Sequence, residues 1–125
     1  MLIFPCYGAY SIVYTNIRIE EEDMTNDLKE HFLYCTAIVQ STKKIGYNDL
    51  IEKLSALQAV TSIEAGCILF KIVPLDRDEE RFALWEIWEN KEAFYAHHQK
   101  DYTKAFFSEQ LDTIVLFESS EKVSL

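Results

Sequence analysis

Glycine and cysteine are both scarce in this chain of 125 residues, which has three of each. Three glycines leave no room for a glycine-rich loop that would cradle a phosphate group. The odd number of cysteines, without a C-x-x-C spacing, argues against a disulfide framework and against a zinc site. We therefore expect Cys6, Cys35 and Cys67 to be small buried hydrophobic residues of a protein in the reducing cytoplasm.

Basic residues are also in deficit, since 12 Lys and Arg stand against 21 Asp and Glu and leave a net charge of −9. Such a surface repels the phosphate backbone of nucleic acids and the headgroups of anionic lipids. We therefore expect no nucleic-acid or membrane partner. The acidic runs at 20–23 and 76–80 are typical of solvated loops.

The uncharged run at the N-terminus, residues 1–17, falls just short of the roughly 18 apolar residues of a membrane-spanning helix. Pro5 and Gly8 interrupt it, and no basic n-region of a signal peptide precedes it. We interpret residues 1–30 as an N-terminal extension that includes an acidic linker. Its first part is either an extra strand at a sheet edge or subunit contact, or a mis-assigned leader (residues 1–23) if Met24 is the true start.

Hydrophobic residues make up 49% of the chain and aromatic residues 14%, which is enough to build one domain with a core or pocket of flat walls. We expect this domain over residues 31–120, with a polar tail at 121–125. β-Branched and apolar runs predict strands, and apolar residues at helical spacing predict helices. The predicted strands span 31–42, 67–74, 81–90 and 112–119, and the predicted helices span 43–62, 91–99 and 101–110, the last two separated by a kink.

The resulting β-α-β-β-α-β order is that of a ferredoxin-like split βαβ fold, an α+β antiparallel sheet with helices on one face. The strand 81–90 has apolar residues on both faces: Leu84 and Trp88 on one, Trp85 and Ile87 on the other. A sheet with one wet face alternates apolar and polar residues. We therefore expect helices to cover one face and a second copy of the sheet to cover the other, which predicts a homodimeric α/β barrel.

The stretch from Trp85 to His97 places two indoles, a carboxyl group and an imidazole close together. His97 is either a helix histidine packed against the sheet or a general base that faces a cleft, since a neutral imidazole accepts a proton near neutral pH. Glu86 lies among apolar neighbours, so it needs a hydrogen-bond partner or a proton. It is either structural or a group that orients His97 or contacts substrate. His98 is about 100° round the helix and is expected at the surface, so the pair does not suggest a metal site.

Four short motifs follow one another along the second half of the chain. They are the Glu64-Ala65-Gly66-Cys67 turn, Glu86-x-Trp88-Glu89 at the end of a strand, Ala96-His97 in the next helix, and the aromatic Phe106. In this arrangement, residues 32–117 resemble the antibiotic biosynthesis monooxygenase (ABM) domain family. The resemblance implies a small dimeric α+β barrel. It also implies one of the family's activities: cofactor-independent oxygenation of quinols and anthrones, haem degradation, or processing of a bacterial autoinducer.

Some positions depart from the family patterns. Leu84 and Phe94 stand where anthrone-oxidising members have Asn and Tyr, and Tyr102 replaces a frequent second histidine. His97 and Phe107 stand where haem-degrading members have Trp and His. The chain is therefore most similar to quinol monooxygenase-like and autoinducer-processing members, which keep a histidine at His97.

The resemblance leads us to expect an ABM-type monooxygenase, an oxidoreductase that uses dioxygen and a small quinol-like or enolisable aromatic substrate, with no cofactor and no metal. Alternatives are an autoinducer-processing enzyme, or a non-enzymatic dimer that binds a small ligand or serves as a stress-related accessory protein. The expected catalytic residues are His97 and Glu86. The expected substrate-binding residues are Leu84, Trp88, Phe94, Tyr102 and Phe106.

Overall fold

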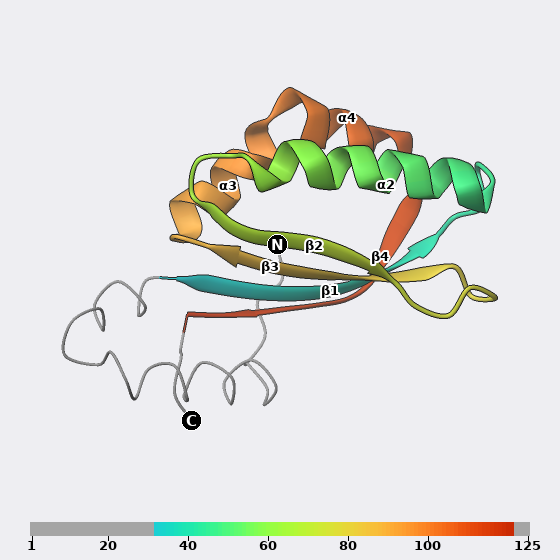
Figure 1. The fold of residues 1–125 in the computed structure, drawn as a ribbon, viewed down its shortest axis with the longest axis horizontal. Helices are drawn as coiled ribbons and strands as arrows, with labels where there is room; N and C mark the ends of the chain where they lie inside the picture. Colours follow the sequence, from blue (N-terminus) through green and yellow to red (C-terminus); the bar gives the residue numbers. More distant parts are fainter. Residues whose placement is uncertain (1–31, 122–125) are drawn as a thin grey trace.

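Four strands and three helices follow one another along residues 32–121, the part of the chain that the computed structural model describes (Figure 1). Their order is the predicted one, and the bounds differ from the predicted ones chiefly at the start of α2. The N-terminal extension at 1–30 lies outside the described residues. The elements are β1 (Leu33–Ser41), α2 (Tyr47–Ser62), β2 (Cys67–Pro74), β3 (Arg81–Trp88), α3 (Lys91–Gln99), α4 (Asp101–Glu109) and β4 (Asp112–Ser120).

Helix α2 begins four residues later than the apolar spacing predicts. Lys43 has a φ of 65°, which a right-handed helix does not accommodate. The chain leaves β1 in a turn in which the backbone N–H of Lys43 donates to Oγ of Ser41 over 2.9 Å. Gly46 then caps the helix with an extended backbone (φ −67°, ψ 161°). The turn formed by residues 41–46 therefore delays the start of the helix, although the spacing of apolar residues favours an earlier start.

The strands form one antiparallel sheet in the order β2-β3-β1-β4 (Figure 1). The register pairs Cys35 with Glu86 and Ala37 with Leu84, so these side chains share a face. All three helices cover this inner face. The ferredoxin-like α+β fold is confirmed, and it brings the expected site residues of β3 beneath the helices.

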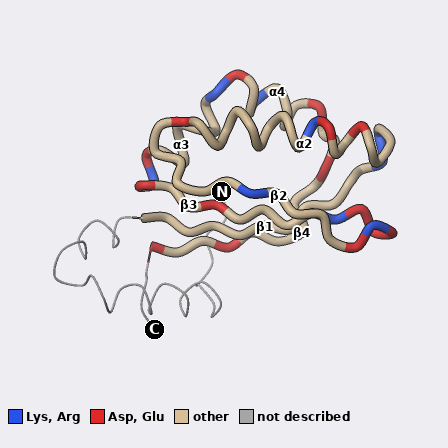
Figure 2. The backbone as a smooth tube through the Cα atoms, in the orientation of Figure 1, with Lys and Arg blue, Asp and Glu red and all other residues tan. Residues whose placement is uncertain are grey.

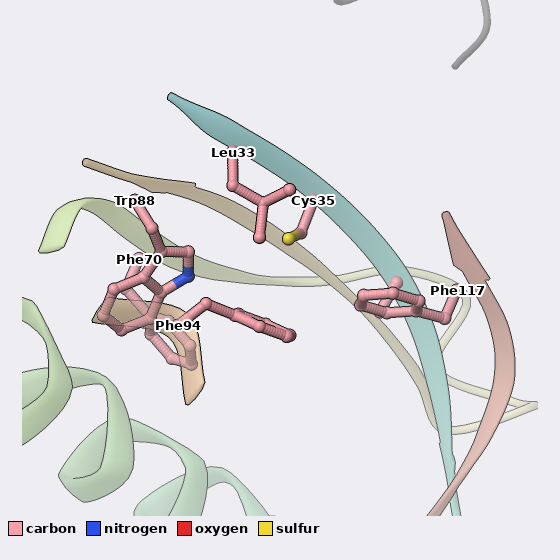
Figure 3. Packing of buried hydrophobic residues seen from close by; sticks show 7 residues of the cluster. Leu33, Cys35, Phe70, Trp88, Phe94 and Phe117 are labelled. Carbon is pink, nitrogen blue, oxygen red and sulfur yellow. The ribbon is translucent and has the colours of Figure 1, made fainter. Parts of the chain in front are cut away.

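The core fills the space between the inner face and the helices in two clusters. One joins Val39 and Phe82 of the sheet to α2 and α4. The other surrounds Trp88, whose ring meets those of Phe70 and Phe94 edge-on, with centroids 6.5 and 6.2 Å apart. Figure 3 shows these three rings beside β1 side chains of the same cluster. Burying such aromatic groups stabilises the fold by roughly 2–3 kcal/mol each, and it sets the position of α3 over β3.

The outer face of the sheet carries apolar side chains that the described chain leaves in part uncovered. Trp85 is 43% exposed, and Leu69 and Leu116 are exposed as well. Ala83 and Ile87 on the same face are buried. The apolar pattern on both faces is thus confirmed, whereas the second copy that was expected to cover the outer face stays a prediction.

Charged residues gather on the helices and on the loop between β2 and β3, while the strands are largely uncharged (Figure 2). Lys43 pairs with Glu80 and Lys53 with Glu109, each over 3.2 Å. Both pairs are at least partly exposed and contribute little to stability. None of the helices in residues 32–121 has the length and apolar character that crossing a membrane requires.

Candidate active site

A narrow cavity of about 70 Å³ lies between the inner face of the sheet and the helices. Phe107 on α4 and Ile114 on β4 line it and are 49% and 56% exposed, which places its opening between these two elements. The remaining apolar walls are Ala37, Val39, Leu54, Leu57, Phe70, Leu84, Phe94, Phe106 and Phe117. The polar groups of the lining are Glu86, His97, His98, Thr103 and Asp112.

Helix α3 carries both histidines, and its position is set at each end. Asn90 is the N-cap, and its side-chain oxygen accepts a hydrogen bond from the backbone N–H of Ala93 over 2.8 Å. At the other end Lys100 is extended (ψ 141°), so the chain breaks and restarts as α4. The kink predicted between the two helices is confirmed. It allows His97 and Thr103, which lie on different helices, to approach each other.

His97 is buried, and its Nδ1 lies 2.9 Å from Oε2 of Glu64. The side chains are 5% and 4% exposed, so this pair is held away from water. The hydroxyl oxygen of Thr103 also lies 3.4 Å from Nδ1. The imidazole packs beside two core aromatic rings in tilted arrangements, with ring centroids 5.1 Å from Trp88 and 5.6 Å from Phe70. His97 thus lies between a buried carboxyl group on one side and the cavity on the other.

The turn between α2 and β2 brings Glu64 to this position. Backbone hydrogen bonds from Glu64 N–H to Thr61 O (3.0 Å) and from Cys67 N–H to Glu64 O (3.1 Å) close the turn. Gly66 adopts a φ of 83°, and a Cβ there would lie 2.5 Å from Cβ of Ala93 on α3. Glycine therefore lets the turn approach α3 closely enough for Glu64 to reach His97.

Glu86 lies on the cavity side of the site, and its Oε1 accepts a hydrogen bond from Nε1 of Trp88 over 2.9 Å. Burial raises the pKa of Glu86 to about 7; the Trp88 hydrogen bond opposes this shift, and the negative charge of Glu64 adds to it. Of the alternatives for Glu86, a hydrogen bond that would orient His97 is not formed among the described residues. Glu64 takes that place, because β3 aims Glu86 at its own strand neighbour two residues on.

His98 differs from its prediction, since it lines the cavity instead of pointing into solvent. Its Nδ1 lies 2.9 Å from the backbone carbonyl oxygen of Phe94, and its ring stacks on Phe107 with centroids 5.9 Å apart and planes at 12°. Burial lowers the pKa of His98. The cause is the neighbouring helix: α4 folds back over α3, so a helix face that α3 alone would expose is covered.

The expected site residues divide into two groups. Leu84, Glu86, Phe94, His97 and Phe106 line the cavity. Trp88 is fully buried behind His97 and is a core residue, and Tyr102 lies outside the cavity lining, where its hydroxyl donates a short hydrogen bond to Oε2 of Glu64. Neither residue lines the cavity. Fewer residues are therefore available to contact a substrate than the sequence pattern predicts.

Glu64, Thr103 and Asp112 complete the site, although no helical or strand periodicity singles them out. Burial raises the pKa of Asp112 to about 6, which suits a carboxyl group at the rim of an apolar cavity. For Glu64 a signal exists, since it opens the Glu-Ala-Gly-Cys turn that carries the family resemblance. Among residues 32–121, no group of three or more His, Cys, Asp and Glu side chains is arranged to hold a metal ion. Cys67 is free, Cys35 is buried in the core, and Cys6 lies outside the described residues.

The chain is similar in sequence to several known proteins. Protein YjcS of Bacillus subtilis is 37% identical over 70 residues, which cover 56% of this chain and 67% of YjcS. Human N-terminal EF-hand calcium-binding protein 1 is 30% identical over 96 residues, which cover 74% of this chain. This chain spans about a quarter (26%) of that longer protein.

Solved structures share the fold. The structure of YjcS superposes with a TM-score of 0.68 at 31% identity and covers 71% of this chain and 96% of YjcS. A conserved protein of Methanosarcina mazei superposes with a TM-score of 0.64 at 20% identity, covering 78% of this chain and 98% of its own. The family model described as antibiotic biosynthesis monooxygenase matches residues 40–109, from β1 to the end of α4. The chain therefore belongs to the antibiotic biosynthesis monooxygenase (ABM) family.

Proposed function

We propose that this protein is a cofactor-independent monooxygenase that acts on a small quinol-like or enolisable aromatic molecule. The observation that carries the proposal is the position of His97, which is buried, lines the cavity and has a carboxyl group on its Nδ1. An imidazole held in this way is a general base for a phenolic or enolic proton. Membership of the ABM family supports a monooxygenase-like role.

The proposed reaction begins when His97 takes the proton of a substrate hydroxyl. The resulting anion is electron-rich and passes an electron to dioxygen, and the two radicals combine into a peroxide. The proton that His97 took returns to the peroxide, and loss of the remaining hydrogen from the same carbon breaks the O–O bond. One oxygen atom stays on that carbon as a carbonyl oxygen and the other leaves as water, so the substrate supplies all four electrons that dioxygen accepts. Glu86, whose pKa near 7 leaves it in part protonated at neutral pH, is placed to hydrogen-bond a substrate oxygen in the cavity.

The size of the cavity limits the substrate. A cavity of about 150 Å³ holds one benzene ring, and the space here is about 70 Å³. A single ring therefore fits only if the opening at Phe107 widens, and a fused three-ring anthrone fits less well. Leu84, Phe94 and Phe106 form the walls that would contact the ring. We therefore expect single-ring quinols to be better substrates than anthrones.

The second candidate is a non-enzymatic protein that binds a small apolar ligand. The mostly apolar lining of the cavity favours it, since such walls bind a flat molecule without any chemistry. An autoinducer-processing activity is a related alternative for the same histidine. Calorimetric binding of an oxidisable quinol that causes no oxygen uptake under the same conditions would favour the binding protein over the proposed oxygenase.

We also propose that the protein works as a homodimer through the outer face of the sheet. The exposed apolar side chains of Leu69, Trp85 and Leu116 share this face. Covering them with the same face of a second copy removes apolar surface from water in a symmetric contact.

Oxygen uptake by metal-free and flavin-free protein tests the proposed activity against a panel of quinols and anthrones. His97→Ala is expected to lower kcat by about 10²–10⁴-fold, the usual contribution of a general base. Gln99→Ala, which changes an exposed residue of the same helix, is the control and should leave the rate unchanged. A folded His97→Ala variant that oxidises the substrate as fast as the unchanged protein would contradict the catalytic role.

A further inference from the structure

We propose that Glu64 is a positioning residue that holds His97 in one tautomer, with the proton on Nδ1 and the lone pair of Nε2 available as the base in the cavity. The inference rests on the proposed function for its catalytic consequence. The tautomer itself is a property of the free protein and is tested without any substrate.

The first step in the argument is the polarity of the contact at Nδ1. Oε2 of Glu64 lies 2.9 Å from Nδ1 and also accepts the hydroxyl hydrogen of Tyr102. The Tyr102 hydroxyl meets Oε2 as a donor, and a carboxylate offers only acceptor sites to both of its neighbours. The hydrogen of the Glu64–His97 contact therefore lies on Nδ1, which leaves Nε2 unprotonated in the neutral ring.

The second step is that Nε2 of His97 has no hydrogen-bond partner among the described residues. His97 lines the cavity, whereas Glu64 and Tyr102 do not. Among residues 32–121, the hydrogen bonds of the His97 ring are all made by Nδ1, to Glu64 at 2.9 Å and to Thr103 at 3.4 Å. Glu64 therefore occupies Nδ1, and Nε2 is left without a hydrogen-bond partner among the described residues and remains for a substrate proton.

The third step is the support of the carboxyl group itself. Glu64 comes from the turn before β2, His97 from α3, and Tyr102 from α4. The Tyr102 hydroxyl, which also lies 3.4 Å from the carbonyl oxygen of Val60, ties Glu64 to the end of α2. Burial and the hydrogen bond to Glu64 raise the pKa of Tyr102 to about 12, so the phenol keeps its proton and remains a donor. Four segments thus fix one carboxyl group against one ring nitrogen.

The two buried carboxyl groups have different tasks in this arrangement. Glu86 lines the cavity and accepts the indole N–H of Trp88, with no hydrogen bond to His97 among the described residues. Glu64 lies outside the cavity and meets the imidazole directly. Removing the charge of Glu64 without changing its shape therefore isolates the positioning role.

Histidine side-chain ¹⁵N NMR on the unliganded full chain measures the tautomer. At about pH 8.5, well above the ordinary imidazole range, we expect His97 to show a protonated Nδ1 and an unprotonated Nε2. In Glu64→Gln the amide offers both an acceptor oxygen and a donor nitrogen, so a mixture of tautomers is expected. His98, whose Nδ1 lies on a backbone carbonyl oxygen, is an internal control that should not change. Glu92→Gln on exposed α3 surface is the matched control variant.

Kinetics on the same variants give the catalytic consequence. We expect Glu64→Gln to lower kcat by about 10²-fold or more with little change in KM, because a histidine in the wrong tautomer fails as a base. Tyr102→Phe keeps the Glu64–His97 pair and should lose less activity.

A wild-type His97 that carries its proton on Nε2 overturns the inference, as does a Glu64→Gln variant with unchanged tautomer and kcat. A wild-type Nδ1–H tautomer in a protein with no oxygenase activity supports the positioning and contradicts only the proposed reaction.

Discussion

Glu86 and Glu64 are two buried carboxyl groups in the same site that differ in their hydrogen-bond donors. Both are buried, but Glu86 has one neutral donor, the indole of Trp88, while Glu64 meets an imidazole and a phenol. A carboxyl group with few donors resists ionisation in an apolar site. Burial and the charge of Glu86 raise the pKa of the Cys35 thiol beside it on β1, which makes that cysteine an unreactive core residue.

The raised pKa of Glu86 predicts a pH-dependent stability. In the unfolded chain its pKa is near 4.5, and in the folded protein it is about 7. The folded state therefore binds more protons between these values, and its stability falls as pH rises from about 4.5 through 7. The shift corresponds to roughly 3 kcal/mol at about 1.4 kcal/mol per pKa unit. Urea unfolding between pH 4.5 and 8 measures this loss.

Glu86→Gln is the variant that isolates the effect, since its amide oxygen still accepts the indole N–H. Relative to the unchanged protein, it should become more stable as pH rises, by up to roughly 3 kcal/mol. Asp112, whose pKa is raised to about 6, contributes with the same sign in both proteins and cancels in the comparison. Parallel stability curves for the two proteins would contradict the assignment.

At the scale of elements, the site depends on the close approach of one turn to one helix. The turn before β2 packs against α3 through Gly66, and the backbone N–H of Glu89 at the end of β3 donates to the Gly66 carbonyl oxygen over 2.8 Å. The N-cap at Asn90 begins α3 directly after this contact. The position of Glu64 relative to His97 is therefore a consequence of how the turn, β3 and α3 meet.

Gly66→Ala is expected to destabilise the protein by roughly 2–4 kcal/mol, because a φ of 83° strains an alanine and its Cβ would lie 2.5 Å from that of Ala93. Gly46→Ala is the control: Gly46 has an ordinary φ, and a Cβ there would lie 4.0 Å from Oδ2 of Asp49. That change should stay within about 1 kcal/mol. Urea unfolding compares the two variants, and equal losses would contradict the argument.

At the scale of the whole molecule, the sheet has two apolar faces and the helices cover one of them. The cavity opens between α4 and β4, on the helix side, so an association through the outer face leaves the opening free. Assembly and access to the site are therefore compatible in the proposed dimer.

Trp85→Glu is expected to convert the dimer to a monomer, because it places a charge on the apolar face that two copies would share. The folded chain itself should lose little stability, since Trp85 is 43% exposed. Light scattering at micromolar protein measures the mass, and Tyr95→Glu, an exposed aromatic of α3, is the control. An unchanged protein that is already monomeric, or a Trp85→Glu protein that remains dimeric, would contradict the proposal.

The sequence by itself determined the order of the elements, the break at Lys100, and the shared face of Leu84 and Glu86. Hydrophobic residues that recur with a period of 2 specify strands, and those that recur with a period of 3.6 specify helices. Gly and Pro residues end these elements. The candidate site residues predicted from the sequence, His97 and Glu86 above all, lie on such periodic elements. Their position on a face follows from the period alone.

Only the tertiary structure decided which polar groups meet. Glu64 and His97 are 33 residues apart, and no local period links a turn residue to a helix residue at that distance. The sequence pattern likewise does not predict that α4 covers His98. Nor does it predict that the Tyr102 hydroxyl binds the Glu64 carboxyl group instead of lining the cavity. Hydrogen-bond partners in a buried site are set by packing between elements, because burial obliges each polar group to find the partner that the fold brings within reach.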